Sequence, residues 1–150
     1  MMVKKFLLVL FLGVLFISCK DNGGVDPDKT ALELISLNLW ELQRYTDATG
    51  QPISNASLNT EALLLYAMQF EFKDDGVVRG LDKTSKNIID KGVWSFIDNE
   101  NSVNVKLTGL DYDFRIVTLK TGQMTLQAPT GNFLSGVGDQ INLEFTSVNQ

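Results

Sequence analysis

The stretch that decides the fold is Met68-Gln-Phe-Glu-Phe-Lys-Asp-Asp-Gly-Val-Val-Arg79. Its first residues alternate between apolar and polar, which is the pattern of a strand with one buried and one solvated face. Asp74-Asp-Gly76 is a tight-turn signal, and an apolar run resumes directly after it. These residues predict an antiparallel hairpin.

The same alternation continues along the chain in both directions from this hairpin. Short links favour pairing between neighbouring strands, and a meander of eight strands closes on itself without exposed edges. The sequence therefore predicts an all-β fold, an eight-stranded antiparallel up-and-down barrel, in preference to a sandwich. The predicted strands cover residues 37–46, 67–73, 77–82, 91–98, 102–108, 112–119, 123–128 and 140–147.

Two segments break the alternation. Residues 30–36 predict one or two helical turns before the first strand, with Thr30 as the N-cap, covering one end of the barrel. Residues 59–67, in the first connection, offer Asn59 as an N-cap followed by strong helix formers. One long apolar strand over residues 63–72 is the competing interpretation, and periodicity does not separate the two.

The N-terminus carries a signal for export. Two lysines precede an apolar run from Phe6 to Ile17, and Ser18 and Cys19, the single cysteine of the chain, follow it. A helix of about twelve residues rises about 18 Å, short of the roughly 30 Å hydrocarbon core of a bilayer. The pattern favours a signal peptide over a membrane span. An ordinary secretory peptide with an incidental cysteine is the alternative to a lipidated one.

The placement of Cys19 resembles the lipobox of bacterial lipoproteins. The resemblance implies a signal peptide over residues 1–18, cleavage before Cys19, and acylation of that residue with chains such as palmitate. Residues 19–29 then form a flexible tether rich in Gly and Asp, and residues 30–150 form the barrel domain. The resemblance implies a lipid-anchored protein of the cell envelope, in the outer membrane of a Gram-negative bacterium, on its periplasmic or surface face.

Composition narrows the classes of function. The chain has 150 residues, 44% of them hydrophobic, which suits one domain plus an export segment. A net charge of −5 disfavours nucleic acid as a partner. The chain has no histidine, and its one cysteine lies in the export segment, so we expect no enzyme, no metal and no cofactor. Paired carboxylates are the remaining catalytic alternative.

Residues 36–147 resemble the bacterial lipocalin-like domains of secreted lipoproteins. The likeness is carried, in order, by Leu39-Trp-Glu-Leu42, Phe70-Glu-Phe-Lys-Asp-Asp-Gly76, Gly92-Val-Trp94 and Phe114-Arg-Ile-Val-Thr-Leu119. It implies an eight-stranded barrel with capacity for a small apolar ligand. The chain departs from true lipocalins at Asn38, where those proteins carry a glycine before the first-strand tryptophan.

The inward-facing positions supply the candidate site. They line either a pocket for a small lipophilic molecule or a filled core. We expect a non-catalytic binder of such a molecule. The alternative is a structural or interaction lipoprotein that binds an envelope protein or glycan through its loops. In both cases the open end near residues 47–66 is the expected contact surface. Arg79 and Arg115 are expected on the solvated face of the barrel. The candidate ligand-binding residues are Trp40, Phe70, Phe72, Trp94, Phe114, Met124 and Phe145.

Overall fold

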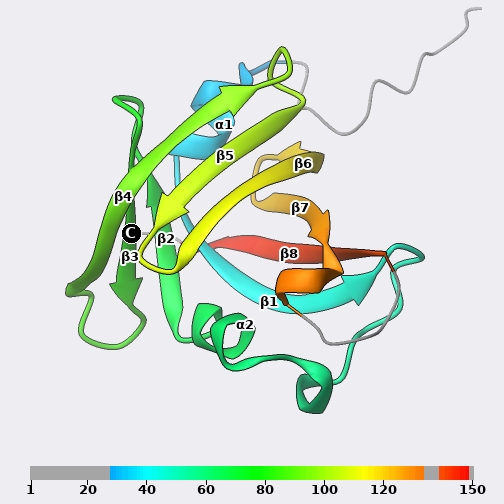
Figure 1. Ribbon diagram of the computed structural model, residues 1–150. Helices are drawn as coiled ribbons and strands as arrows, with labels where there is room; N and C mark the ends of the chain where they lie inside the picture. Colours follow the sequence, from blue (N-terminus) through cyan, green and yellow to red (C-terminus); the bar gives the residue numbers. More distant parts are fainter. Residues whose placement is uncertain (1–27, 134–138, 149–150) are drawn as a thin grey trace, which may run out of the picture.

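The computed structural model describes residues 28–133 and 139–148, so the predicted signal peptide, Cys19 and most of the predicted tether lie outside the described residues. The eight strands pair in chain order, and the last returns to the first to close a barrel (Figure 1). The predicted all-β, antiparallel up-and-down barrel is confirmed. Its strands are β1 (Leu39–Asp47), β2 (Met68–Phe72), β3 (Val77–Asp82), β4 (Ile88–Ile97), β5 (Ser102–Leu107), β6 (Leu110–Lys120), β7 (Gln123–Pro129) and β8 (Gln140–Val148).

The largest difference from the predicted boundaries is at β4, which begins at Ile88 rather than at residue 91. The β3–β4 turn is tighter than expected because the Asp82 carboxylate organises it. This carboxylate accepts hydrogen bonds from the main-chain N–H groups of Thr84 and Ser85 at 3.0 and 2.7 Å. The chain therefore resumes strand geometry early, and β4 extends to the end of the barrel.

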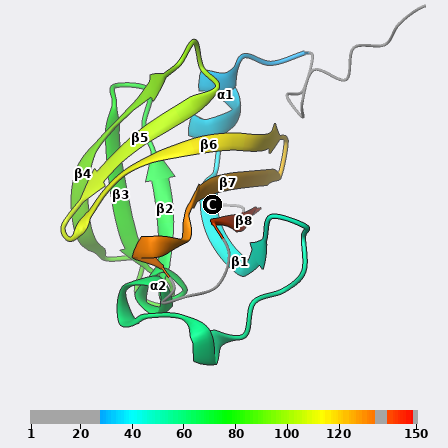
Figure 2. The same cartoon turned by 45° about the vertical axis from the view of Figure 1, so that its right-hand side comes forward.

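Both predicted helical segments are present, one at each end of the barrel (Figures 1 and 2). α1 (Ala31–Ser36) begins with a capping box between Thr30 and Glu33 and buries Leu34 and Ile35. α2 (Thr60–Leu65) is capped by Asn59, whose side-chain oxygen accepts from the N–H of Ala62 at 2.8 Å. The helical interpretation of residues 59–67 is thus confirmed over residues 60–65. Short 3-10 turns lie at η1 (Asn55–Ser57) and η2 (Thr130–Asn132).

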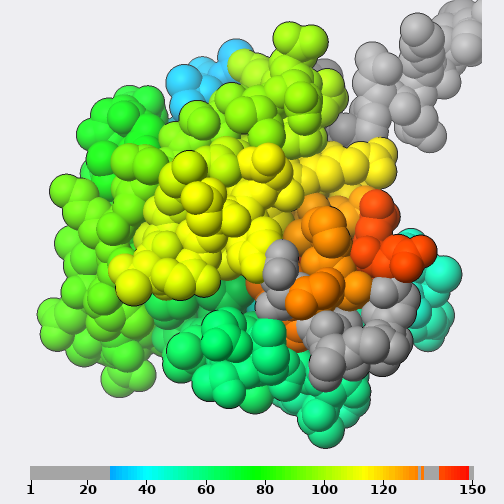
Figure 3. Space-filling view, in the orientation of Figure 1, coloured from blue at the N-terminus to red at the C-terminus, as the bar shows by residue number. Residues whose placement is uncertain are grey.

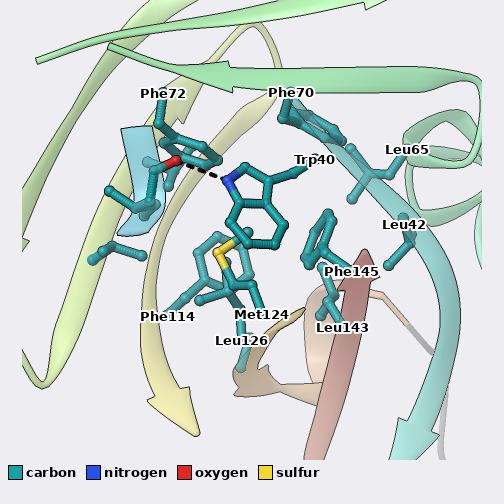
Figure 4. Packing of buried hydrophobic residues seen from close by; sticks show 14 of the residues in the cluster. Trp40, Leu42, Leu65, Phe70, Phe72, Phe114, Met124, Leu126, Leu143 and Phe145 are labelled. Atoms are coloured by element: carbon teal, nitrogen blue, oxygen red, sulfur yellow. Dashed lines mark hydrogen bonds between the residues drawn. The ribbon is translucent and has the colours of Figure 1, made fainter. Parts of the chain in front are cut away.

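Trp40 lies at the centre of the core, with Met124 and Phe145 against it (Figure 4). Its indole is fully buried, and the ring N–H donates to the Ile35 carbonyl oxygen at 2.7 Å, which fastens α1 to β1. Burying the polar edge of an indole is favourable only with such a partner. One side chain therefore closes the α1 end of the barrel.

β4 and β5 approach each other closely at Gly92. A Cβ atom at this position would lie 1.7 Å from the main-chain oxygen of Lys106, far inside van der Waals contact. No residue other than glycine fits there without separating the two strands.

β1 departs from its neighbour β2 early. The two strands pair only over Leu39–Glu41, whereas the pairing of β1 with β8 continues to Asp47. The connection after β1 fills the space between them. Ile53 donates its N–H to the Tyr45 carbonyl at 2.9 Å, and the Tyr45 hydroxyl donates to the Ala62 carbonyl of α2 at 2.9 Å. All the strands lie between Leu39 and Val148, so the barrel closes within one continuous segment.

Candidate functional site

The interior of the barrel is filled by its own side chains. The space left within it is about 20 Å³ and is bordered by Phe70, Phe72, Phe114 and Phe145. That volume holds about one water molecule, not an organic ligand. The seven predicted ligand-binding residues meet here as buried core, and their contact with a ligand stays a prediction. They are Trp40, Phe70, Phe72, Trp94, Phe114, Met124 and Phe145.

A much larger pocket, of about 410 Å³, opens at the α2 end of the barrel. It lies between α2, the β5–β6 hairpin and η2, and Figure 3 shows the hairpin in yellow above the green α2 segment at this end. This is the end near residues 47–66 that the sequence analysis singled out. The pocket is lined by Asn59, Glu61, Leu64, Leu65, Met68, Thr108, Gly109, Leu110, Tyr112, Gly131 and Phe133.

Local sequence shapes the wall formed by the β5–β6 hairpin. Gly109 has a φ of +75°, the left-handed region that glycine enters without strain, and this allows a tight turn. The Asp90 carboxylate fixes the turn from β4, because it accepts from the N–H of Thr108 at 3.0 Å and from its hydroxyl at 3.1 Å. Leu110 and Tyr112 then follow on the strand that borders the pocket.

Aromatic side chains form a layer between the pocket and the core. Phe133 is buried, with its ring centroid 5.4 Å from Tyr112 and 6.2 Å from Phe114. Its main-chain oxygen accepts from the N–H of Asn59 at 3.2 Å, which links the chain after β7 to the start of α2. Sequence reasoning missed Phe133 because it follows Pro129 and belongs to no alternating run. The tripeptide Pro129-Thr-Gly131 shortly before it predicts a turn at the surface, so nothing in the local sequence indicated that Phe133 is buried.

Among the described residues, the pocket is lined mainly by apolar side chains, with the polar side chains of Asn59, Thr108 and Tyr112 and one charged side chain, Glu61 in the first turn of α2. In the part of the chain that the structure describes, no lysine or arginine forms an ion pair with Glu61. Desolvation, and then the negative charge of Glu61, raise the pKa of Tyr112. The pocket therefore places a phenol hydroxyl and the side chain of an acidic residue beside apolar side chains.

The other surface features are less suited to holding a ligand. A hollow of about 310 Å³ on the outer face of β1, β7 and β8 is mostly polar, and the charges of Arg44 and Glu144 pair within it at 2.7 Å. Arg79 pairs with Glu71 at 3.2 Å on the outside of the barrel, and Arg115 is exposed, as expected. Over residues 28–133 and 139–148, no group of three acidic, histidine or cysteine side chains is placed to hold a metal ion.

Comparison with known proteins supports the fold. No protein-family model matches the chain, and no curated protein matches it. Among solved structures, it is similar to the crystal structure of a DUF4847 family protein from Bacteroides vulgatus ATCC 8482. The TM-score is 0.51 at 15% sequence identity, over 81% of this chain and 99% of that one. This likeness concerns the barrel alone. None of the helices in the described residues is both long and apolar enough to cross a bilayer.

Proposed function

We propose that this chain is a lipid-anchored, non-catalytic binding protein that holds a small lipophilic molecule at the mouth of its barrel. The observation that carries the proposal is the pocket of about 410 Å³ at the α2 end. Its volume lies within the roughly 300–1,000 Å³ typical of small-molecule sites, whereas the filled interior offers no comparable space. The ligand of this barrel therefore sits on the packed core rather than inside it.

The apolar walls of the pocket supply the affinity. Leu64 is 58% exposed on α2 and lines the pocket together with Leu110 and Met68. Apolar surface removed from water stabilises a complex by about 25 cal/mol per Å², so about 100 Å² of apolar wall covered by a ligand contributes roughly 2.5 kcal/mol before the cost of association. The filled barrel beneath is a rigid support, which limits the ordering cost of binding.

Native mass spectrometry tests the pocket. The barrel domain, residues 28–150, contains the whole closed sheet and is expressed in a bacterial periplasm, so that its ligand is present during folding. We expect a stoichiometric bound mass that Leu64→Asp removes. Leu63→Asp is the matched control, because Leu63 is 41% exposed on the same helix but does not line the pocket. A bound mass unchanged by Leu64→Asp would contradict the proposed location.

The lipid anchor rests on the sequence pattern around Cys19. Cys19→Ser in the full chain removes the thiol that receives the diacylglyceryl group. We expect this variant to leave the membrane fraction or to remain unprocessed, and Ser18→Ala serves as the neighbouring control. Unchanged processing and membrane partitioning in Cys19→Ser would refute the anchor.

A second candidate function is a docking surface for an envelope protein. Large apolar side chains are exposed at the same end of the barrel, with Ile88 and Ile89 at 53% and 54% beside the β3–β4 turn, in addition to Leu63 and Leu64 on α2. If the native domain carries no small molecule, site-specific crosslinking from Ile88 in cells is the next measurement. A crosslinked partner lost on Leu64→Asp would favour this function over the first.

A further inference from the structure

We infer that the mouth pocket selects an amphiphile with a cationic head, such as a primary ammonium group, and discriminates against fatty-acid carboxylates. This inference rests on the proposed function, because it names the chemical class of the ligand for that same pocket. It concerns the head of the ligand, whereas the apolar walls hold its tail.

Charge and apolar surface lie on one face of α2. Glu61 precedes Leu64 and Leu65 by three and four residues, the spacings that bring side chains together on a helix. All three line the pocket. The carboxylate therefore stands one helical turn from the apolar wall, so that an ammonium group at the carboxylate leaves its chain lying along the two leucines.

The other lining side chains do not offset this charge. Among the residues that the structure describes, the ten that line the pocket with Glu61 are all uncharged. The negative potential of Glu61 reaches the opposite wall, because it contributes, after desolvation, to the raised pKa of Tyr112 on β6. A carboxylate ligand placed between these two side chains meets repulsion on the α2 side and gains no cationic partner on the β6 side.

Three lysines around this end of the barrel are engaged elsewhere. Lys83 pairs with Glu41 at 2.9 Å, and the Lys86 ammonium donates to the Gln69 side-chain oxygen at 2.7 Å. Lys106 pairs with Asp111 at 3.3 Å. The net charge of the chain, −5, acts in the same direction, since it attracts cations to the surface and repels anions.

The experiment compares three probes with the same ten-carbon tail: decylammonium, decanol and decanoate. Each is titrated into the barrel domain at pH 7, below its micellar concentration, with calorimetry for affinity. Chemical shifts of the Leu64 methyl groups and the Tyr112 ring report occupancy of the pocket. The variants are Glu61→Gln and, as the matched control, Glu100→Gln, which removes the same charge from the β4–β5 turn at the opposite end of the barrel.

We expect decylammonium to bind about tenfold more tightly than decanoate, the discrimination typical of a partly solvated ion pair with hydrogen bonds. Glu61→Gln is expected to reduce the preference to less than about twofold, while Glu100→Gln preserves it. Equal or tighter binding of decanoate to the wild type would overturn the cationic selectivity. The proposed pocket would still hold if decanol changes the chemical shifts of the Leu64 methyl groups. A preference retained in Glu61→Gln would overturn the assignment to Glu61. If none of the probes shifts Leu64 or Tyr112, the proposed function fails and the inference fails with it.

Discussion

The hydroxyl of Tyr45 is expected to hold α2 in place, and Tyr45→Phe tests this with the loss of a single oxygen atom. The hydroxyl is buried and donates to the Ala62 carbonyl at 2.9 Å. α2 spans only Thr60–Leu65. The last carbonyl groups of so short a helix have no N–H partner further along the helix and need hydrogen-bond donors from outside it. Ala62 is fully buried, and without the tyrosine hydroxyl its carbonyl loses its partner from β1.

The magnitude follows from the cost of a buried, unsatisfied acceptor, about 1–3 kcal/mol. The phenyl ring stays in place, so no cavity adds to this cost, and we expect Tyr45→Phe to lower the free energy of unfolding by about 2 kcal/mol. Urea denaturation followed by tryptophan fluorescence should show a lower midpoint with an unchanged slope. Hydrogen exchange should accelerate first over residues 60–67, because α2 is the element released.

Tyr112→Phe is the matched control, since it removes the same atom from a side chain at the edge of the pocket. We expect its effect on unfolding to stay within about 0.5 kcal/mol. If Tyr45→Phe is as stable as Tyr112→Phe, or if exchange over α2 is unchanged, the Tyr45 hydroxyl is not what fastens the helix and this reasoning is refuted.

Three further predictions concern the barrel itself. Trp94→Ala should cost roughly 3–5 kcal/mol of unfolding free energy by chemical denaturation, because Trp94 is buried, and a near-neutral result would contradict its place in the core. Gly92→Ala should cost at least about 1–3 kcal/mol, because a Cβ 1.7 Å from the Lys106 oxygen must push β4 and β5 apart; an unchanged melting temperature would show that the strands are not so close. The hydrogen bond from the Ser85 main chain lowers the pKa of Asp82, so the stability it provides is present above about pH 4 and is lost as pH falls through the lowered value. Melting temperature should therefore fall more steeply below about pH 4 in the wild type than in Asp82→Asn, and parallel curves would refute this role.

The strands could be predicted because alternation is a local property of the sequence, but two bulges redirect side chains in a way that alternation does not reveal. Strict alternation from Trp40 and Leu42 places Arg44 inside, whereas an irregularity between Leu42 and Arg44 turns Tyr45 inward instead. A second irregularity, between Ile116 and Thr118, buries Leu119 in the same way. Burying an apolar or aromatic side chain in place of an arginine or threonine favours each bulge.

The site was predicted only in its location. The open end near residues 47–66 follows from the long first connection, but the pocket depends on the meeting of α2, the β5–β6 hairpin and η2, which are far apart in sequence. In the sequence, Glu61 could be recognised only as an acidic residue in the first turn of a helix. Acidic residues at this position commonly stabilise the helix, so the position did not predict a binding site. The sequence could not show whether the barrel is hollow or filled. The answer depends on how the aromatic rings pack together in the interior, and the list of inward-facing positions does not determine that packing.

The two ends of the barrel are unlike, and the chain enters the domain at the end that lacks the pocket. Asp28, the first described residue, leads into α1, whereas the pocket opens at the other end, beside α2 (Figures 1 and 2). Cys19 and Asp28 are nine residues apart, which corresponds to at most about 32 Å of fully extended chain. In a chain held by a lipid at Cys19, the start of α1 therefore stays within about 32 Å of the attachment point, and the pocket opens at the end of the barrel away from α1. A ligand of that pocket would then enter the barrel domain from the end opposite the point of attachment.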